Sequence, residues 1–245
     1  MVLVLSKGIQ RMVWAVFFLF IIFLFTTLSK SPVIKGKLGE IKVSHLLQKH
    51  LKSPTYQVLD DVTVPSINGT TQIDHVVISP YGIFVIETKN FKGWIYGKAH
   101  DPKWTQTTHG KKSYFQNPVR QNYAHVKALE AITSLDESVF HSMVVFTGSA
   151  EFKTSIPGEV CNLDTLAERI KLEGRKLLSI EEVIAATHAI KAGRLEPGFK
   201  TDYAHVKALG KRFEGTVQKG VTQGVSRGVS QLVFTVGIKL LAIVG

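Results

Sequence analysis

Cysteine is almost absent from this sequence. Its 245 residues contain a single cysteine, Cys161, which excludes an intrachain disulfide and a cysteine-rich zinc site. The lack of disulfides fits a reducing compartment. Acidic residues are also scarce, with 19 Asp and Glu against 30 Lys and Arg and a net charge of +11. This excess predicts an anionic partner, nucleic acid or an anionic membrane surface; the alternative is a basic surface without a binding role.

Base-reading motifs and long-period repeats are also missing. The heptapeptide YAHVKAL occurs at 123–129 and again at 203–209, but nothing similar precedes either copy. The chain is therefore not a repeat protein. A hydrophobic content of 44% allows a core for one large or two small domains.

The stretch Thr71–Asn90 is the one around which the chain is organised. Two runs rich in Val, Ile and Phe, Gln72–Ser79 and Ile83–Ile86, flank Pro80-Tyr81-Gly82. Apolar runs on either side of a Pro/Gly turn predict a β-hairpin.

The charged residues of this hairpin fall at unusual positions. Asp74 lies inside the first strand, and Glu87 and Lys89 end the second. Because strand side chains alternate, Glu87 and Lys89 point the same way and Thr88 points the opposite way. Carboxylates beside such apolar runs must be paired or must hold a metal. A cation such as Mg²⁺ binds one or two carboxylates and fills its shell with water and phosphate oxygens.

These residues resemble the D…(D/E)xK core of the PD-(D/E)xK nucleases, and the wider pattern resembles the nuclease-related domain (NERD) family. The resemblance covers Lys35–Phe146, with Ile73 rather than Pro before the aspartate. The motifs that carry it, in the order the family uses, are Gly36-x-x-Gly39-Glu40, Gln72-Ile73-Asp74-His75, Gly82-Ile83-Phe84-Val85-Ile86-Glu87-Thr88-Lys89-Asn90, Gly93-Trp94, Trp104-x-Gln106 and Asn117-Pro118-x-x-Gln121-Asn122.

The resemblance implies a metal-dependent phosphodiesterase. Asp74 and Glu87, assisted by the Thr88 carbonyl, would bind Mg²⁺ or Mn²⁺, and Lys89 would stabilise the hydroxide or the pentacovalent phosphate. Glu40 would orient Lys89 or hold a second ion. The alternatives are a strand-end ion pair for Glu87 and Lys89, and a solvated glutamate favoured by the helix dipole for Glu40.

The fold class predicted is α/β, with a PD-(D/E)xK-like mixed central sheet flanked by helices and an N-terminal transmembrane helix. Gln121 lies in the first turns of a helix that starts at Asn117-Pro118, and the resemblance to these nucleases implies that it approaches the active site, whereas His125 is expected to be structural. Asp60-Asp61 is interpreted as a pair of edge or solvent residues. The other expected elements are helices at Gly36–Leu51, Asn117–Leu135, Asp164–Lys171 and Ile180–Lys191 and strands at Tyr56–Val64 and Met143–Thr147.

Residues 90–113 form a polar segment in which aromatic residues alternate with lysines. Trp94, Tyr96 and Trp104 either stack bases or pack the far end of the sheet. The residues predicted to bind nucleic acid are Lys92, Trp94, Lys98, Lys103, Lys111 and Lys112.

The two ends of the chain are apolar. Met12–Leu28 carries no charge and no cleavage site follows it, which favours an uncleaved membrane anchor over a signal peptide. Glycines 220, 224 and 228 lie four residues apart, as in helices that pack closely, and precede an apolar end; the alternative is a flexible tail. The predicted divisions are an anchor (1–30), a NERD domain (35–195), a linker and helix (196–219) and a membrane-associated tail (220–245).

The sequence thus predicts a membrane-anchored, Mg²⁺-dependent nuclease that hydrolyses nucleic acid, with DNA favoured, and whose domain faces the cytoplasm. The alternative is a non-catalytic nucleic-acid-binding or adaptor protein at the membrane. Homo-oligomerisation and substrate structure stay open.

Overall fold

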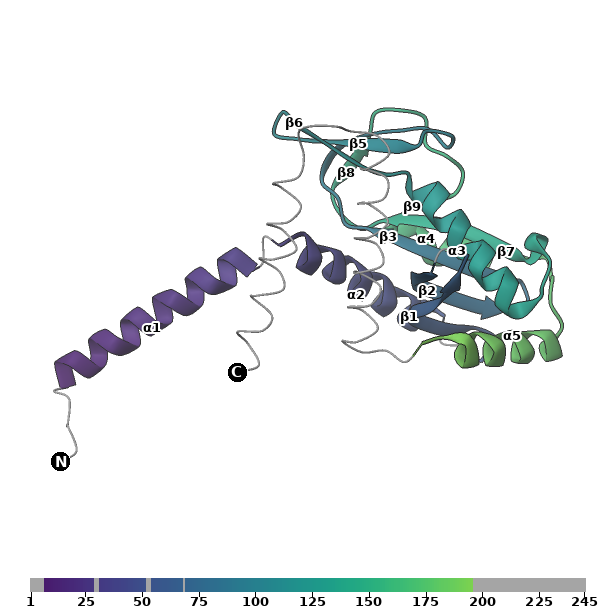
Figure 1. The fold of residues 1–245 in the computed structure, drawn as a ribbon, viewed down its shortest axis with the longest axis horizontal. Helices are drawn as coiled ribbons and strands as arrows, with labels where there is room; N and C mark the ends of the chain where they lie inside the picture. The colour runs from purple at the N-terminus through teal and green to yellow at the C-terminus, as the bar shows by residue number, and fades with distance from the viewer. Residues whose placement is uncertain (1–6, 29–30, 52–53, 68, 196–245) are drawn as a thin grey trace. The chain divides into compact units, whose positions relative to one another are not determined.

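The computed structural model describes residues 7–28, 31–51, 54–67 and 69–195. Over these residues the chain is mixed α/β, as the sequence predicts (Figure 1). In chain order its elements are α1 (Lys7–Leu28), α2 (Pro32–His50), β1 (Gln57–Ser66), β2 (Gly69–Ser79), β3 (Gly82–Lys89), β4 (Gly93–Tyr96), β5 (Lys103–Thr108), β6 (Lys111–Gln116), α3 (Pro118–Thr133), the short 3₁₀ helix η1 (Glu137–Val139), β7 (Phe140–Phe146), β8 (Ala150–Phe152), β9 (Val160–Asn162), α4 (Leu163–Leu172) and α5 (Ile180–Gly193).

A five-stranded mixed sheet, in the order β1-β2-β3-β7-β9, forms the centre of the domain. Strands β1, β2 and β3 are antiparallel, whereas β7 runs parallel to β3 and β9 runs parallel to β7. The predicted hairpin is confirmed, because β2 and β3 pair up to Ser79 and Gly82 around the turn. Gly82 has φ 123°, a conformation that favours glycine.

Helices cover both faces of this sheet, which explains why its strands read as nearly continuous apolar runs. On one face α3 and α5 contribute Leu129 and Ile190 to a core with Val85 of β3. On the other face α2 and α4 contribute Leu47 and Ile170. The side chains of β3 alternate between these two cores, so Glu87 and Lys89 lie on the α3 side.

In a second sheet of four strands, in the order β6-β5-β4-β8, the strands β4, β5 and part of β6 arise from the segment 90–113 that was expected to be polar, and β8 comes from the chain after β7. Ile95 and Trp104 on one face are 0% and 1% exposed and pack with Phe146 of β7. For Trp104 the packing alternative is therefore correct, because its ring has no free face for a base. Figure 1 shows this sheet beyond the end of β3 and β7.

The predicted N-terminal transmembrane helix is unsupported. Helix α1 forms over Lys7–Leu28, and its described side chains from Met12 to Phe23 are exposed. Among the residues that the structure describes, no helix combines the length and apolar character that a bilayer crossing requires. The predictions for 196–219 and 220–245, and the second YAHVKAL copy, lie outside the described residues.

Candidate active site

The site begins where β2 separates from β3. The backbone ladder between these strands ends at the pair His75 and Ile86. Beyond it, the backbone N–H of Thr88 donates to Oδ2 of Asp74 at 2.7 Å. A carboxylate thus takes the place that a strand carbonyl would otherwise fill, and it lies against the peptide bond that joins Glu87 to Thr88.

A local distortion of β1 and β2 accompanies this separation. Asp61 on β1 has φ 55°, an uncommon conformation for a residue other than glycine. Leu59 and Val62 lie in the same core although they are three residues apart, and so do Ile73 and Val76 on β2. Regular alternation would place residues three apart on opposite faces, so both strands change face here. Such distortions are frequent beside functional sites.

Glu87 and Lys89 meet on the α3 side of β3. Nζ of Lys89 donates to Oε1 of Glu87 at 2.5 Å and to Oε1 of Gln121 at 3.1 Å. The other oxygen of Glu87, Oε2, makes no hydrogen bond to any described residue and lies 3.6 Å from Nδ1 of His125. The Glu87 side chain is 4% exposed, so this oxygen is a buried acceptor open to a further donor or a cation.

His125, which lies next to Glu87, was predicted from the sequence to be only structural. It is buried and lies beside a predicted site carboxylate. Its position four residues after Gln121 on the same helix was the available signal, because residues four apart share a helix face.

Two asparagines hold α3 in place. Oδ1 of Asn117 accepts from the N–H groups of the first helical turn, and its Nδ2 donates to carbonyls of the β4–β5 connection. Nδ2 of the fully buried Asn122 donates to the Val85 carbonyl on β3 and to the Met143 carbonyl on β7. The helix is thereby tied to both strands, which fixes Gln121 over Lys89.

Helix α2 approaches the same strand end from the opposite face. A Cβ atom added to Gly39 would lie 2.9 Å from Cβ of Asn90 and 3.3 Å from Cγ2 of Thr88. Glycine is therefore required for the helix to come this close. The next residue, Glu40, accepts from Nζ of Lys37 at 2.9 Å. The structure thus pairs Glu40 with Lys37, and Lys89 with other partners.

Asp74 stands in an electrostatically unfavourable position. Burial raises the pKa of its carboxyl well above the usual value, and the neighbouring charges of Glu87 and Glu40 raise it further. The Thr88 amide and the Lys89 ammonium offset only part of this. A bound cation would relieve the repulsion among these carboxylates. Within the described ranges, no group of three or more His, Cys, Asp and Glu side chains is arranged to hold a metal.

Asp60 lies on β1, an edge strand of the five-stranded sheet, as the sequence predicts, but its carboxylate is bound to other side chains and is not simply in solvent. Its Oδ1 lies 2.7 Å from Nδ1 of the buried His75, and its Oδ2 accepts from Oγ of Ser44 on α2 at 2.5 Å. Burial raises the pKa of Asp60, but these hydrogen bonds outweigh it and hold the pKa below the ordinary value. Asp61 instead accepts a hydrogen bond from Gln72.

The residues predicted to bind nucleic acid do not form a single surface. Lys103, Lys112 and Trp94 lie on the exposed face of the four-stranded sheet, whereas Lys111 alternates to the other face. Lys92 and Lys98 are exposed in the connections on either side of β4.

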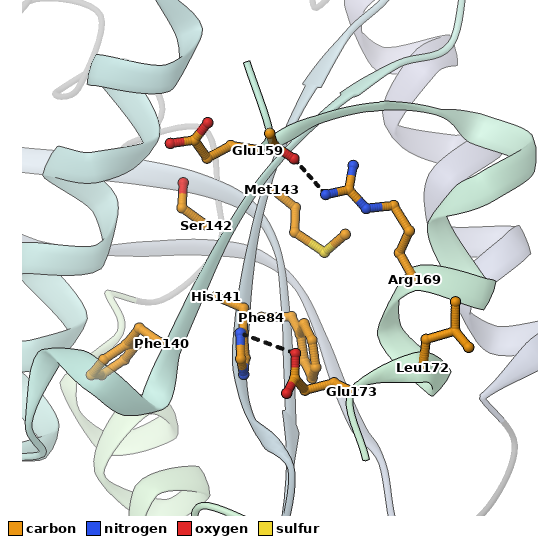
Figure 2. A pocket seen from close by; sticks show the side chains of 10 residues that line it. Phe84, Phe140, His141, Ser142, Met143, Glu159, Arg169, Leu172 and Glu173 are labelled. Carbon is orange, nitrogen blue, oxygen red and sulfur yellow. Dashed lines mark hydrogen bonds and ion pairs between the residues drawn. The ribbon is translucent and has the colours of Figure 1, made fainter. Parts of the chain in front are cut away.

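A pocket of about 640 Å³ lies elsewhere, at the start of β7 (Figure 2). His141 stacks on Phe84 there, with ring centroids 4.6 Å apart. The Arg169 guanidinium donates to the carbonyls of Val160 and Gly158, so part of its donor capacity is already used. Phe84 is five residues from Lys89 along β3, or roughly 16 Å, and none of the predicted site residues lines this pocket.

The structure therefore brings Asp74, Glu87, Lys89 and Gln121 together at the end of β3. Comparison with known families identifies the domain that contains them. Residues 35–147 match the model of the nuclease-related domain family. The chain contains a nuclease-related domain, and this family belongs to the PD-(D/E)xK-like nuclease superfamily. The predicted resemblance is confirmed.

A curated protein of Bacillus anthracis, described as uncharacterized, is 54% identical over 100 residues. The match covers 40% of this chain and 47% of that protein, so the chain spans about half the length of this relative. No solved structure matches the chain.

Proposed function

We propose that this protein is a metal-dependent nuclease that hydrolyses phosphodiester bonds of nucleic acid, with DNA favoured as substrate. One observation carries the proposal: residues from β2, β3 and α3 converge on the end of one strand. They are Asp74, Glu87 with Thr88, Lys89 and Gln121. A structural ion pair alone would not require a second carboxylate from β2 beside the same peptide bond.

The residues present fit a divalent cation. Asp74 and Glu87 would hold Mg²⁺ or Mn²⁺, with the Thr88 carbonyl as a third oxygen ligand, because hard cations prefer such oxygens. The buried Oε2 of Glu87, without a hydrogen bond among the described residues, and the raised pKa of Asp74 both support a cation here. When bound, the ion supplies Lewis-acid activation of the phosphate and of a water.

The chain itself supplies a fixed positive charge. Glu87 and Gln121 both accept from Nζ of Lys89, so the ammonium is held in place before substrate arrives. A preorganised cation stabilises the negative charge that develops on the phosphate in the transition state. Glu40 influences this site electrostatically, because its charge raises the pKa of Asp74. In this proposal Glu40 would also be a ligand for a second ion.

The test is a cleavage assay with the full chain on DNA and RNA substrates, with Mg²⁺ or Mn²⁺ and with a chelator. We expect cleavage only with metal. Lys89→Ala and Glu87→Ala should each lower the rate by roughly 10²-fold or more, the usual cost of removing a preorganised electrostatic group. Lys127→Ala is the matched control, because this lysine of α3 is 40% exposed and forms its ion pairs with Glu130 and Glu137, not with the site residues.

Wild-type protein that cleaves nothing at low salt would contradict the proposal, and so would a Lys89→Ala protein with full activity. The alternative is a non-catalytic adaptor, which the direct Glu87–Lys89 ion pair favours. An adaptor would bind nucleic acid without metal, and Glu87→Ala would leave this binding unchanged.

We also propose that α1 attaches the chain to a membrane surface, with the domain on the cytoplasmic side. Twelve consecutive apolar residues, Met12–Phe23, are exposed in this helix, and such a helix gains free energy in an apolar environment. Co-flotation with anionic vesicles tests this. Deletion of residues 1–30 should abolish flotation, and equal flotation of both proteins would refute the attachment.

A further inference from the structure

The four-stranded sheet has one face in the core and one in solvent. On the solvent side, Trp94 lies opposite Thr107, which lies opposite Lys112. In the next row, Tyr96 lies opposite Thr105, which lies opposite Tyr114. We call this the aromatic face, and it comprises Trp94, Tyr96, Lys103, Lys112, Tyr114 and Lys153.

Two of the three aromatic side chains of this face, Trp94 and Tyr114, are exposed to solvent, and Tyr96 is half-buried. Trp94 is 47% exposed and Tyr114 is 71% exposed, whereas Ile95 and Trp104 on the opposite face are 0% and 1% exposed. Exposed aromatic groups on a rigid sheet are typical of binding surfaces. The residues between them on β5 are the small threonines Thr105 and Thr107.

Lysines flank these rings. Lys103 and Lys112 are exposed at the two ends of the β5–β6 pair. Nζ of Lys153 on the β8 side lies 5.0 Å from the centroid of the Trp94 ring and also pairs with Glu151. Three lysines against one glutamate leave the face with net positive charge, which complements a phosphate backbone.

We propose that the aromatic face binds single-stranded nucleic acid. Unpaired bases stack on Trp94 and Tyr114, and Lys103 and Lys112 contact the phosphates. Trp94 and Tyr114 lie two strands apart and are offset by two residues along the strands, which separates their Cα atoms by roughly 12 Å. The bases of a duplex are stacked on one another and cannot lie on these rings, so the face discriminates against duplex.

The Lys153 ammonium does not block this use of Trp94. A cation–π contact at an exposed site is weaker than a base–aromatic stack, so an arriving base displaces it. The released ammonium then lies beside the phosphate of the same nucleotide. The choice of nucleic acid as occupant rests on the proposed nuclease function, but binding can be measured without cleavage.

The experiment measures fluorescence anisotropy of the full chain with labelled DNA and RNA single strands and with the DNA duplex, in chelator so that no cleavage occurs. Trp94→Ala and Tyr114→Ala should each weaken single-strand binding roughly tenfold, the usual effect of losing one stacking ring. Trp94→Phe keeps a ring and should retain most of the affinity. Tyr123→Ala is the matched control, because Tyr123 is 50% exposed but lies on α3.

The proposal is overturned if Trp94→Ala and Tyr114→Ala bind as tightly as the wild type, if duplex binds as tightly as single strand, or if no oligonucleotide binds at low salt. The DNA and RNA arms show which strand the face prefers. A cleavage assay on the same variants separates this proposal from the nuclease function. Selective single-strand binding without any cleavage would support the proposed role of the aromatic face and refute the nuclease function. Cleavage by the wild type, with unaltered binding by both variants, would support the nuclease function and refute the role of the aromatic face.

Discussion

The two sheets of this domain differ in how many of their faces are covered by other elements. The five-stranded sheet is covered by helices on both sides, and its charged groups are paired at the end of β3. The four-stranded sheet is covered on one side only, and it leaves tryptophan and tyrosine rings in solvent. The first sheet therefore buries a carboxylate and raises its pKa, whereas the second presents aromatic groups to solvent.

The two sheets are nonetheless connected, because two neighbouring strands of the first sheet each lead into a strand of the second. Strand β3 leads into β4 after Lys89, and β7 leads into β8 after Phe146; the pairs β3–β7 and β4–β8 are both parallel. The candidate active site lies where one pair gives way to the other.

The largest expected effect contrasts the two faces of the small sheet. Trp104→Ala should lower the free energy of unfolding by about 3–5 kcal/mol, because it removes a fully buried ring. Trp94→Ala should change it by less than about 1 kcal/mol, since its ring is half exposed. Denaturant unfolding measures both, and equal losses would break the comparison.

The next effect tests how closely α2 must cover the large sheet. Gly39→Ala places a Cβ atom 2.9 Å from Asn90 and from Thr147, so the helix must shift, at a cost of roughly 1–3 kcal/mol. A Cβ at Gly36, on the same helix, meets nothing within 4 Å. Gly36→Ala should therefore be neutral or stabilising by up to about 1 kcal/mol. Similar unfolding midpoints for the two variants would argue against the close approach.

The smallest effect contrasts two aspartates of neighbouring strands. Because the pKa of Asp74 is raised in the folded state, the stability contributed by this group falls as pH rises from about 4 toward the raised pKa. Asp74→Asn should therefore stabilise the protein at neutral pH by roughly 0.5–2 kcal/mol, with no gain at pH below 4, and should abolish cleavage.

Asp60→Asn should act in the opposite direction. The pKa of Asp60 is lowered, so its contribution is present above the ordinary carboxyl pKa and is lost as pH falls toward the lowered value. We expect a loss of roughly 1 kcal/mol at neutral pH, reduced by partial exposure of the carboxylate. Unfolding curves for both variants across pH give the sign of each change in the free energy of unfolding. If both substitutions changed this free energy in the same direction at neutral pH, the environments of the two carboxylates would not differ as described.

Much of the fold could be predicted from local patterns. The β2–β3 hairpin and α4 follow from apolar periodicity, and the helices after Asn117 and Ser179 follow from periodicity together with capping residues, which act within a few residues. The second sheet was missed because short strands with mixed Thr, Lys and aromatic residues carry no clear period. The partners of Asp60 were missed for a different reason, since Ser44 and His75 reach it from other elements.

The order of residues alone determined that Glu87 and Lys89 share one side of a strand, because backbone geometry fixes the alternation of side chains. Only tertiary structure decided that Asp74 leaves its ladder to accept from Thr88, and that Glu40 pairs with Lys37. It also decided that Trp94 is exposed while Trp104 is buried. These outcomes depend on which helix or strand lies against each face, and that contact is made between segments far apart in the chain.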